Sequence, residues 1–183
     1  MSVSLRCYST SLGCPKNRVD TERLLGSLGV ALVPVESPDE AELVFINTCA
    51  FIQPATEESV RTIAQAIADI EELPKRPLLA VAGCLVGRYH AEDLAPELPE
   101  VDLWLDNSDL ACPAMLARKL GLPEPTVPGR ILSTGPSYAW LKISDGCRHA
   151  CSFCAIPNIR GGHRSHCKDM IVREARALLD QGV

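Results

Sequence analysis

Short apolar runs alternate with amphipathic stretches over the first two thirds of the chain. The apolar runs are four to six residues long and rich in aliphatic residues, which is typical of buried strands. They predict strands over residues 4–8, 30–35, 43–46, 78–82 and 101–105. Helical patterns separate these runs, over residues 18–28, from Pro54 onward and over 110–120. The alternation predicts an α/β fold with a parallel sheet covered by helices on both faces.

Terminal signals define the two longest of these helices. Asn17 is placed to cap the helix over 18–28, and Gly29 is placed to end it. Pro54 suits the first turn of the long helix, where its fixed φ angle is already helical. Apolar residues recur along that helix at helical spacing, at Val60, Ile63, Ala64, Ile67 and Ile70. We expect this stripe to face the sheet.

The pattern breaks after residue 120. Residues 121–136 contain four prolines and three glycines, so we predict a linker over 121–137 that follows an N-terminal domain of residues 1–120. Beyond the linker, the pattern predicts a strand over 139–143 and a helix over 169–180. One strand–loop–helix unit is too small to form a domain of its own. Residues 138–183 are therefore interpreted as the first part of a second, incomplete domain.

Charge and hydropathy narrow the classes of partner. The chain has 18 Lys and Arg against 23 Asp and Glu, a net charge of −5, and 4% aromatic residues. This composition does not suit non-specific nucleic-acid binding, so nucleic acid is not an expected partner of this part of the protein. No apolar run approaches the roughly 20 residues of a membrane-spanning helix, and the N-terminus does not resemble a signal peptide. We expect a cytoplasmic protein without a membrane partner.

Nine cysteines are unusual for a protein of a reducing compartment. Disulfides do not persist there, so metal binding or catalysis is the better interpretation. Cys147, Cys151 and Cys154 form a C-x3-C-x2-C motif, whose thiolates suit a 4Fe-4S cluster with one iron left open. The alternative is a structural zinc ion, which needs four ligands and would take His149 or Cys167 as the fourth.

A second set of cysteines is spread along the first domain. Cys14, Cys49 and Cys84 each follow a predicted strand, and the carboxyl ends of parallel strands meet at one edge of the sheet. Gly13 and Gly83 directly precede two of them and would let the backbone approach a bulky cluster. The alternative is that each is a small buried hydrophobe, which is common in α/β cores.

The sequence SDGCRHACSFCAIPNIRG at Ser144–Gly161 resembles the radical S-adenosylmethionine (SAM) superfamily, and more narrowly its methylthiotransferase branch. The resemblance implies that Cys147, Cys151 and Cys154 hold a 4Fe-4S cluster whose open iron binds SAM. It also implies reductive cleavage of SAM to a radical, with an electron donor such as flavodoxin or ferredoxin. Phe153 is then a candidate contact for the SAM adenine; the alternative is that it packs in the core.

The sequences SLGCPKNRVDTE, INTCAFI and AGCL resemble the N-terminal domain of the same methylthiotransferases. The resemblance implies that Cys14, Cys49 and Cys84 hold an auxiliary 4Fe-4S cluster that presents sulfur for transfer. The remaining cysteines match no position of the motifs and are interpreted as structural or incidental: Cys7, Cys112 and Cys167. Lys16, Asn17 and Asp20 lie beside Cys14 and are interpreted as capping or solvated residues rather than as groups that orient substrate or cluster.

Two branches of the methylthiotransferases differ in substrate. GCPKN, VDTE and NTCAFI resemble the branch that acts on a ribosomal protein. This implies a transferase that adds a methylthio group to the β-carbon of an aspartate in small-subunit ribosomal protein twelve. The alternatives are the branch that modifies isopentenylated adenosine in transfer RNA, and a non-catalytic metal-binding module.

Some features depart from the family pattern. The family usually has a Ser-Arg pair after Arg-Gly, whereas here RGGHRSH places His166 after Ser165. The family also continues well beyond Val183. We therefore expect this stretch to contain only the start of a radical SAM (β/α) barrel and to be inactive by itself.

Overall fold

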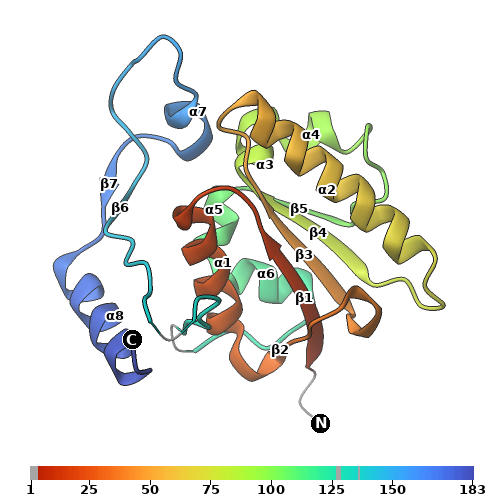
Figure 1. The fold of residues 1–183 in the computed structure, drawn as a ribbon, viewed down its shortest axis with the longest axis horizontal. Helices are drawn as coiled ribbons and strands as arrows, with labels where there is room; N and C mark the ends of the chain where they lie inside the picture. Colours follow the sequence, from red (N-terminus) through yellow and green to blue (C-terminus); the bar gives the residue numbers. More distant parts are fainter. Residues whose placement is uncertain (1–3, 127–128, 136) are drawn as a thin grey trace.

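The computed structural model describes residues 4–126, 129–135 and 137–183. Its centre is a five-stranded sheet in the order β2-β1-β3-β4-β5, with every neighbouring pair parallel (Figure 1). The strands are β1 (Leu5–Ser11), β2 (Leu32–Pro34), β3 (Leu43–Thr48), β4 (Leu78–Gly83) and β5 (Leu103–Leu105). The predicted α/β class and parallel sheet are confirmed. The strand order reverses direction between β1 and β3, and in parallel α/β sheets functional sites commonly lie at the carboxyl ends of the strands at such a point.

Helices cover both faces of this sheet (Figure 1). On one face, α1 (Pro15–Leu28), α5 (Asn107–Leu110) and α6 (Pro113–Lys119) pack against Phe45 and its neighbours. On the other face, α2 (Gln53–Glu71), α3 (Cys84–Tyr89) and α4 (Ala91–Leu94) pack against Val44 and Ile46. All six residues of β3 are buried, as expected for a central strand with helices on both sides.

The start of α1 differs from the prediction. The helix begins at Pro15, with Cys14 in the N-cap position, because proline at the first helical position is already in helical geometry. Asn17 therefore lies inside the first turn, and the prediction that it caps the helix is wrong. Its side chain is fully buried and donates to the backbone oxygens of Leu12 and Thr48, at 3.0 and 2.7 Å. Gly29 ends α1 as predicted, with a φ of 54°.

The stripe along α2 is confirmed only in part. Ile63 and Ile70 are buried, but Val60 is 42% exposed and Ser59 is buried in its place. The reason is a polar one: the Ser59 hydroxyl donates to the Cys49 oxygen and accepts from the Cys49 amide. The helix predicted over 110–120 is instead two short helices, α5 and α6, and the sequence patterns missed α3 and α4.

Residues beyond the linker differ most from the prediction. No ladder forms over 139–143, so the predicted strand there is wrong, and Trp140, Leu141 and Ile143 are exposed. In the part of the chain that the structure describes, this run belongs to neither sheet, although the Ile143 oxygen accepts from the His166 amide at 2.9 Å. The short antiparallel pair β6 (Ser144–Asp145) and β7 (Arg164–Ser165) follows instead. The helix predicted over 169–180 is confirmed as α8 (Lys168–Asp180), and a short helix α7 (Ile156–Arg160) precedes it.

The predicted linker runs partly along α1. Ile131 donates its amide to the Glu22 oxygen at 3.1 Å, and the backbone of Arg130 lies so close to Gly26 that a Cβ there would be 2.3 Å away. Residues 127, 128 and 136 of the predicted linker lie outside the described residues. Within the described residues, no helix has the length and hydropathy needed to cross a membrane.

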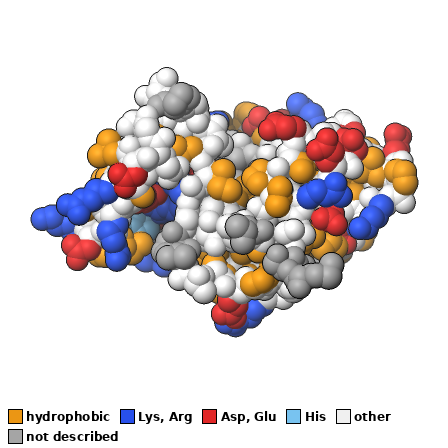
Figure 2. Space-filling model, turned by 90° about the horizontal axis from the view of Figure 1, so that it is seen from below, with side chains coloured by type: hydrophobic (Ala, Val, Ile, Leu, Met, Phe, Trp, Pro, Cys, Tyr) orange, Lys and Arg blue, Asp and Glu red, His pale blue; other side chains and the backbone are white. Residues whose placement is uncertain are grey.

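Charge is unevenly distributed along the molecule. Residues 138–183 carry seven Lys and Arg against four Asp and Glu, whereas the chain as a whole is acidic. Figure 2 shows Lys and Arg side chains gathered at the end of the molecule that these residues form. The local surface charge there is therefore opposite to the net charge.

Candidate functional site

Three cysteines from three adjacent strands meet at the carboxyl edge of the sheet. Cys14 lies three residues after β1, Cys49 directly follows β3, and Cys84 directly follows β4 as the first residue of α3. Neighbouring contacts bring them together: a Cβ on Gly13 would be 2.7 Å from the Cys49 sulfur. Cys84 in turn interacts electrostatically with both Cys49 and Cys14. Residues separated by about seventy positions thus share one site, which we call the edge cysteines.

The edge cysteines form a half-open site. Cys49 and Cys84 are buried, at 7% and 4% exposure, whereas Cys14 is exposed. Burial raises the pKa of the Cys84 thiol, the nearby Cys49 and Cys14 raise it further, and the Arg160 guanidinium opposes them. A metal that binds these sulfurs must displace the thiol protons, so binding would release protons.

Two glycines at this edge adopt backbone conformations that favour glycine. Gly13 and Gly83 have φ angles of 81° and 95°, which L side chains rarely adopt. A Cβ on Gly13 would collide with the Cys49 side chain at 2.5 Å, and a Cβ on Gly83 would lie 2.1 Å from Oδ1 of Asn47. In this structure the glycines therefore allow adjacent strand ends to approach one another.

Buried polar groups fix the loops that carry the edge cysteines. Asn17 joins the loops after β1 and β3 through its two donated hydrogen bonds. The Asn47 side chain donates to the backbone oxygen of Asn17 and to the Thr21 hydroxyl, both at 2.9 Å. Ser59 holds both backbone groups of Cys49. The sequence patterns missed Ser59; its place on the apolar face of a long helix was the signal.

The other three cysteines lie on a closed loop between β6 and β7. The amide of Cys147 donates to the Gly161 oxygen at 3.1 Å, and that of Cys154 donates to the Cys151 oxygen at 3.1 Å. Cys151 is exposed, and the other two are half-buried. We call residues 147–154 the cysteine loop. Phe153 is 89% exposed, so the alternative that it packs in the core is wrong.

A single metal ion and a cubane cluster need different arrangements of their ligands. Over residues 4–126, 129–135 and 137–183, no three His, Cys, Asp or Glu side chains lie close enough together to hold one metal ion. The ligands of a zinc ion all lie about 2.3 Å from one atom. Each cysteine of a cubane cluster binds a different iron, so its ligands stand further apart.

The remaining cysteines lie outside both sets. Cys7 is 1% exposed, and burial raises the pKa of its thiol to about 12. Such a thiol stays protonated and unreactive at neutral pH. Cys112 and Cys167 are exposed.

The helix that follows the cysteine loop packs against the helix that begins at Cys84. In α7, Ile159 is buried in the core cluster that also contains Cys84. Its oxygen accepts from the Asn107 side chain at 2.8 Å, and a Cβ on Gly87 would lie 2.7 Å from the same oxygen. The close approach of α7 and α3 thus places the end of the cysteine loop next to the edge cysteines.

Arg160, the last residue of α7, lies at the centre of a buried ionic network. Its side chain is 3% exposed and contacts Asp20 at 3.1 Å and Asp145 at 2.9 Å. Lys142 contacts both carboxylates at 2.6 Å. The interpretation of Asn17 and Asp20 as capping or solvated residues is therefore wrong, because both face this network; Lys16 is exposed and lies 3.9 Å from Asp145.

The charges in this network shift the affinity of its members for protons. Burial alone would raise the pKa of Asp145, but the hydrogen bond from Lys142 and the charges of Arg160 and Lys142 outweigh burial and lower it. Burial disfavours the charged form of Arg160, yet Cys84 and the two carboxylates outweigh this and raise its pKa. Both groups are therefore charged at neutral pH.

A second group of ion pairs fastens the region beyond the linker to α1. Glu22, which is 2% exposed, accepts from Arg130 at 2.7 and 2.9 Å and from the amide and hydroxyl of Ser133. Glu174 on α8 pairs with both Arg130 and Arg23. We call this set of contacts the α1 junction. It joins three segments that the sequence patterns treat as independent.

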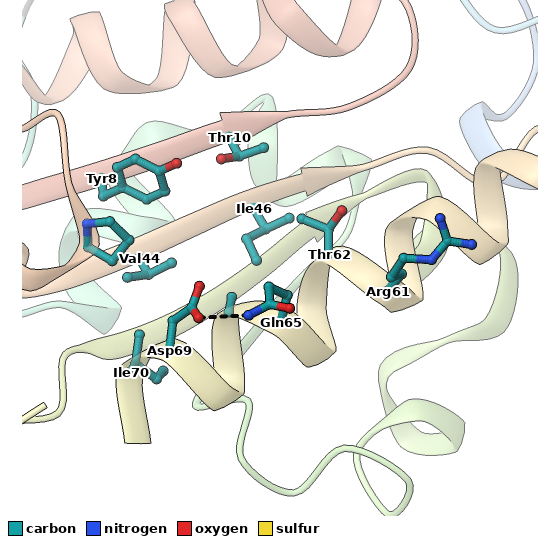
Figure 3. A pocket seen from close by; sticks show the side chains of 11 residues that line it. Tyr8, Thr10, Val44, Ile46, Arg61, Thr62, Gln65, Asp69 and Ile70 are labelled. Atoms are coloured by element: carbon teal, nitrogen blue, oxygen red, sulfur yellow. Dashed lines mark hydrogen bonds between the residues drawn. The ribbon is translucent and has the colours of Figure 1, made fainter. Parts of the chain in front are cut away.

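A hollow of about 350 Å³ lies elsewhere, between α2 and the sheet. Figure 3 shows Arg61, Thr62 and Gln65 of α2 on one side and Tyr8 and Thr10 of β1 on the other. No cysteine lines it. The hollow is therefore separate from the two cysteine sets.

Comparison with known proteins adds a family and named relatives. The sequence profile described as "Uncharacterized protein family UPF0004" matches residues 6–106, which include the edge cysteines. The protein named ribosomal protein uS12 methylthiotransferase RimO from Nitratidesulfovibrio vulgaris (strain DP4) is 70% identical over 177 residues, covering 96% of this chain and 41% of the relative. The protein of that name from Lawsonia intracellularis (strain PHE/MN1-00) is 56% identical over 184 residues, with 100% and 42% coverage.

A more distant relative has the same name. The Aquifex aeolicus (strain VF5) protein is 48% identical over 176 residues, covering 94% of this chain and 38% of the relative. The chain thus spans about two fifths of the length of these curated relatives.

Proposed function

This chain belongs to the UPF0004 family, and on that premise we propose that it is the N-terminal part of a radical SAM methylthiotransferase. The observation that carries the proposal is the meeting of Cys14, Cys49 and Cys84 at one edge of the sheet, with the cysteine loop packed beside them through α7. The names of the relatives support the same activity. The whole protein's activity is a transfer of a methylthio group.

The edge cysteines would hold one 4Fe-4S cluster and the cysteine loop another. The donor chemistry fits both: each set offers three thiol ligands, which suit iron–sulfur clusters. When bound, the clusters and SAM supply the reducing electron, the radical and the transferable sulfur. The chain's own part is to orient these ligands, and the exposed ring of Phe153 is available to stack on the SAM adenine.

The substrate we propose is an aspartate of small-subunit ribosomal protein uS12, modified at its β-carbon. The relatives are named for methylthiotransfer to uS12. The reducing electron would come from a partner such as flavodoxin or ferredoxin, and the protein would work in the cytoplasm. Residues 1–120 would form the auxiliary-cluster domain and 121–137 a linker, with 138–183 as the start of the radical SAM barrel.

Metal content tests the two cluster sites separately. Full-length protein reconstituted anaerobically should hold about eight irons and eight sulfides, as two four-iron clusters require. Replacing Cys147 with Ala should abolish SAM cleavage and leave the cluster of the edge cysteines. The matched control is Cys112→Ala, which removes an exposed cysteine outside both sets and should change neither value. Stoichiometric zinc without iron would refute the proposal.

Product analysis tests the substrate. Incubation of the reduced full-length enzyme with SAM and uS12 should add one methylthio group to an aspartate-containing peptide, read by mass spectrometry. Modification of an adenosine in transfer RNA, with uS12 unchanged, would show that the proposed substrate is wrong while leaving the cluster assignment intact.

A further inference from the structure

Arg160 is shared by the two cysteine sets. It ends α7, six residues after Cys154, and its guanidinium donates to Oδ1 of Asn17 at 2.5 Å. The sulfur of Cys84 lies 3.5 Å from that same oxygen. The guanidinium and the sulfur therefore converge on one buried atom, although they come from segments about seventy-six positions apart.

The Asn17 amide cannot turn away from this meeting point. Its nitrogen donates to the oxygens of Leu12 and Thr48, which fixes its oxygen toward Cys84 and Arg160. A thiol can donate its proton to that oxygen, but a thiolate that binds iron has none to donate. The Cys84 thiolate would then face the negative end of the Asn17 side-chain carbonyl dipole. In a buried site this repulsion is strong unless a cation balances it.

Arg160 is the cation placed to provide that balance. Asp20 and Asp145 hold it in position, at 3.1 and 2.9 Å, and only 3% of its side chain is exposed. Lys142 faces the same carboxylates, and Lys16 lies 3.9 Å from Asp145. Three cations thus face two carboxylates. The carboxylates therefore do not cancel the whole positive charge that the network presents to the edge cysteines.

We propose that Arg160 is a positioning residue that raises the reduction potential of the cluster held by the edge cysteines, an inference that rests on the function proposed above. Reduction adds negative charge to a cluster, so a fixed neighbouring cation favours the reduced state. Because Arg160 also pairs with Asp145, two residues before Cys147, the same side chain fixes the cysteine loop relative to that cluster.

The test isolates one cluster. In full-length protein, Cys147, Cys151 and Cys154 are all replaced by Ala, so that only the edge cysteines retain a cluster. Arg160→Gln and Arg160→Lys are then introduced into this parent. The midpoint potential is measured by redox titration, with the electron paramagnetic resonance signal of the reduced cluster as readout, and iron content is measured on the same samples.

The expected result is a graded shift to more negative potential. Arg160→Gln should shift it most. Arg160→Lys should shift it less, because lysine keeps a charge but lacks the planar fork that reaches Asn17 and both carboxylates together. Where Arg160→Gln does not fold, the Arg160→Lys shift alone decides the matter. The matched control is Arg130→Gln, which breaks another buried guanidinium pair at the α1 junction and should leave the potential unchanged.

The outcomes separate the inference from its premise. Unchanged potentials in both Arg160 variants at full iron content would overturn the inference and leave the cluster assignment standing. An equal shift in Arg130→Gln would also overturn it, because loosening of the α1 junction would then explain the effect. A parent protein that takes up no iron at the edge cysteines would refute the proposed function itself.

Discussion

Glu22 is the acidic centre of the α1 junction, and its charge is the contact we expect to matter most for stability. One carboxylate oxygen accepts two hydrogen bonds from Arg130, at 2.7 and 2.9 Å, and the other accepts two from Ser133, at 2.9 and 2.6 Å. The paired side chains are 2% and 5% exposed, so solvent screens the pair little. Glu22→Gln keeps the shape of the side chain and removes its charge.

The size of the stability loss follows from the hydrogen bonds that a glutamine at position 22 cannot accept. If its oxygen keeps the Ser133 bonds, its amide nitrogen points a donor at the Arg130 guanidinium, and two charge-assisted bonds of about 1.5–3 kcal/mol each are lost. Arg130 retains Glu174 as a partner, which reduces the loss. Breaking a buried pair from one side typically costs about 3–5 kcal/mol. We expect the free energy of unfolding to fall by about 3 kcal/mol.

Two tryptophans allow the effect to be located. Trp140 lies beyond the linker and Trp104 lies in β5, so single-tryptophan variants in a urea titration report on each region separately. Glu22→Gln should move the Trp140 transition to lower urea more than the Trp104 transition. The matched control is Glu124→Gln, which breaks an exposed pair with Arg118 and should leave both transitions in place. A Glu22→Gln change below about 0.5 kcal/mol would refute the energetic role of the charge.

Three other predictions follow from single positions. Gly83→Ala should lower the free energy of unfolding by more than about 1 kcal/mol, because the φ of Gly83 is 95° and the added Cβ would lie 2.1 Å from Oδ1 of Asn47. The control Gly121→Ala, at a position with positive φ but open space, should lower it less in the same urea titration. Equal losses would contradict a steric clash at Gly83. Native protein treated with iodoacetamide at pH 8 should stay unmodified at Cys7, whose buried thiol has its pKa raised to about 12, while exposed cysteines react; equal labelling in peptide mass spectra would contradict this. Burial and nearby cationic groups lower the pKa of His166, so the unfolded chain takes up a proton first and stability should decline as pH falls from about 6.5. His166→Gln should remove that first part of the decline in denaturation curves recorded from pH 7 to 5, and an unchanged decline would show that another group causes it.

Local sequence patterns predicted an element correctly where its own residues decide whether it is buried. The runs over 43–46 and 78–82 correspond to β3 and β4 because a strand buried on both faces must be apolar throughout. The three cysteines that follow strands were placed at one edge because parallel strands share their carboxyl ends. The run over 139–143 misled for the converse reason. In the part described, this run joins no ladder of a sheet, and a strand without a ladder leaves most of its backbone groups unpaired.

The sequence by itself determined the α/β class, the order of the main elements and the motif of Cys147, Cys151 and Cys154, because each depends on spacing within a short stretch of chain. It also indicated the edge cysteines, because each of them follows a predicted strand of a parallel sheet. Only the tertiary structure decided what Asn17, Asp20 and Arg160 do. Asn17 and Asp20 occupy ordinary positions on a helix, and Arg160 closes a short one, so no local pattern distinguishes them from solvated residues. They become a buried network only when α7 packs against α3 and returns the cysteine loop to α1. The low dielectric of that junction, which the chain creates by folding, is what makes their charges and hydrogen bonds consequential.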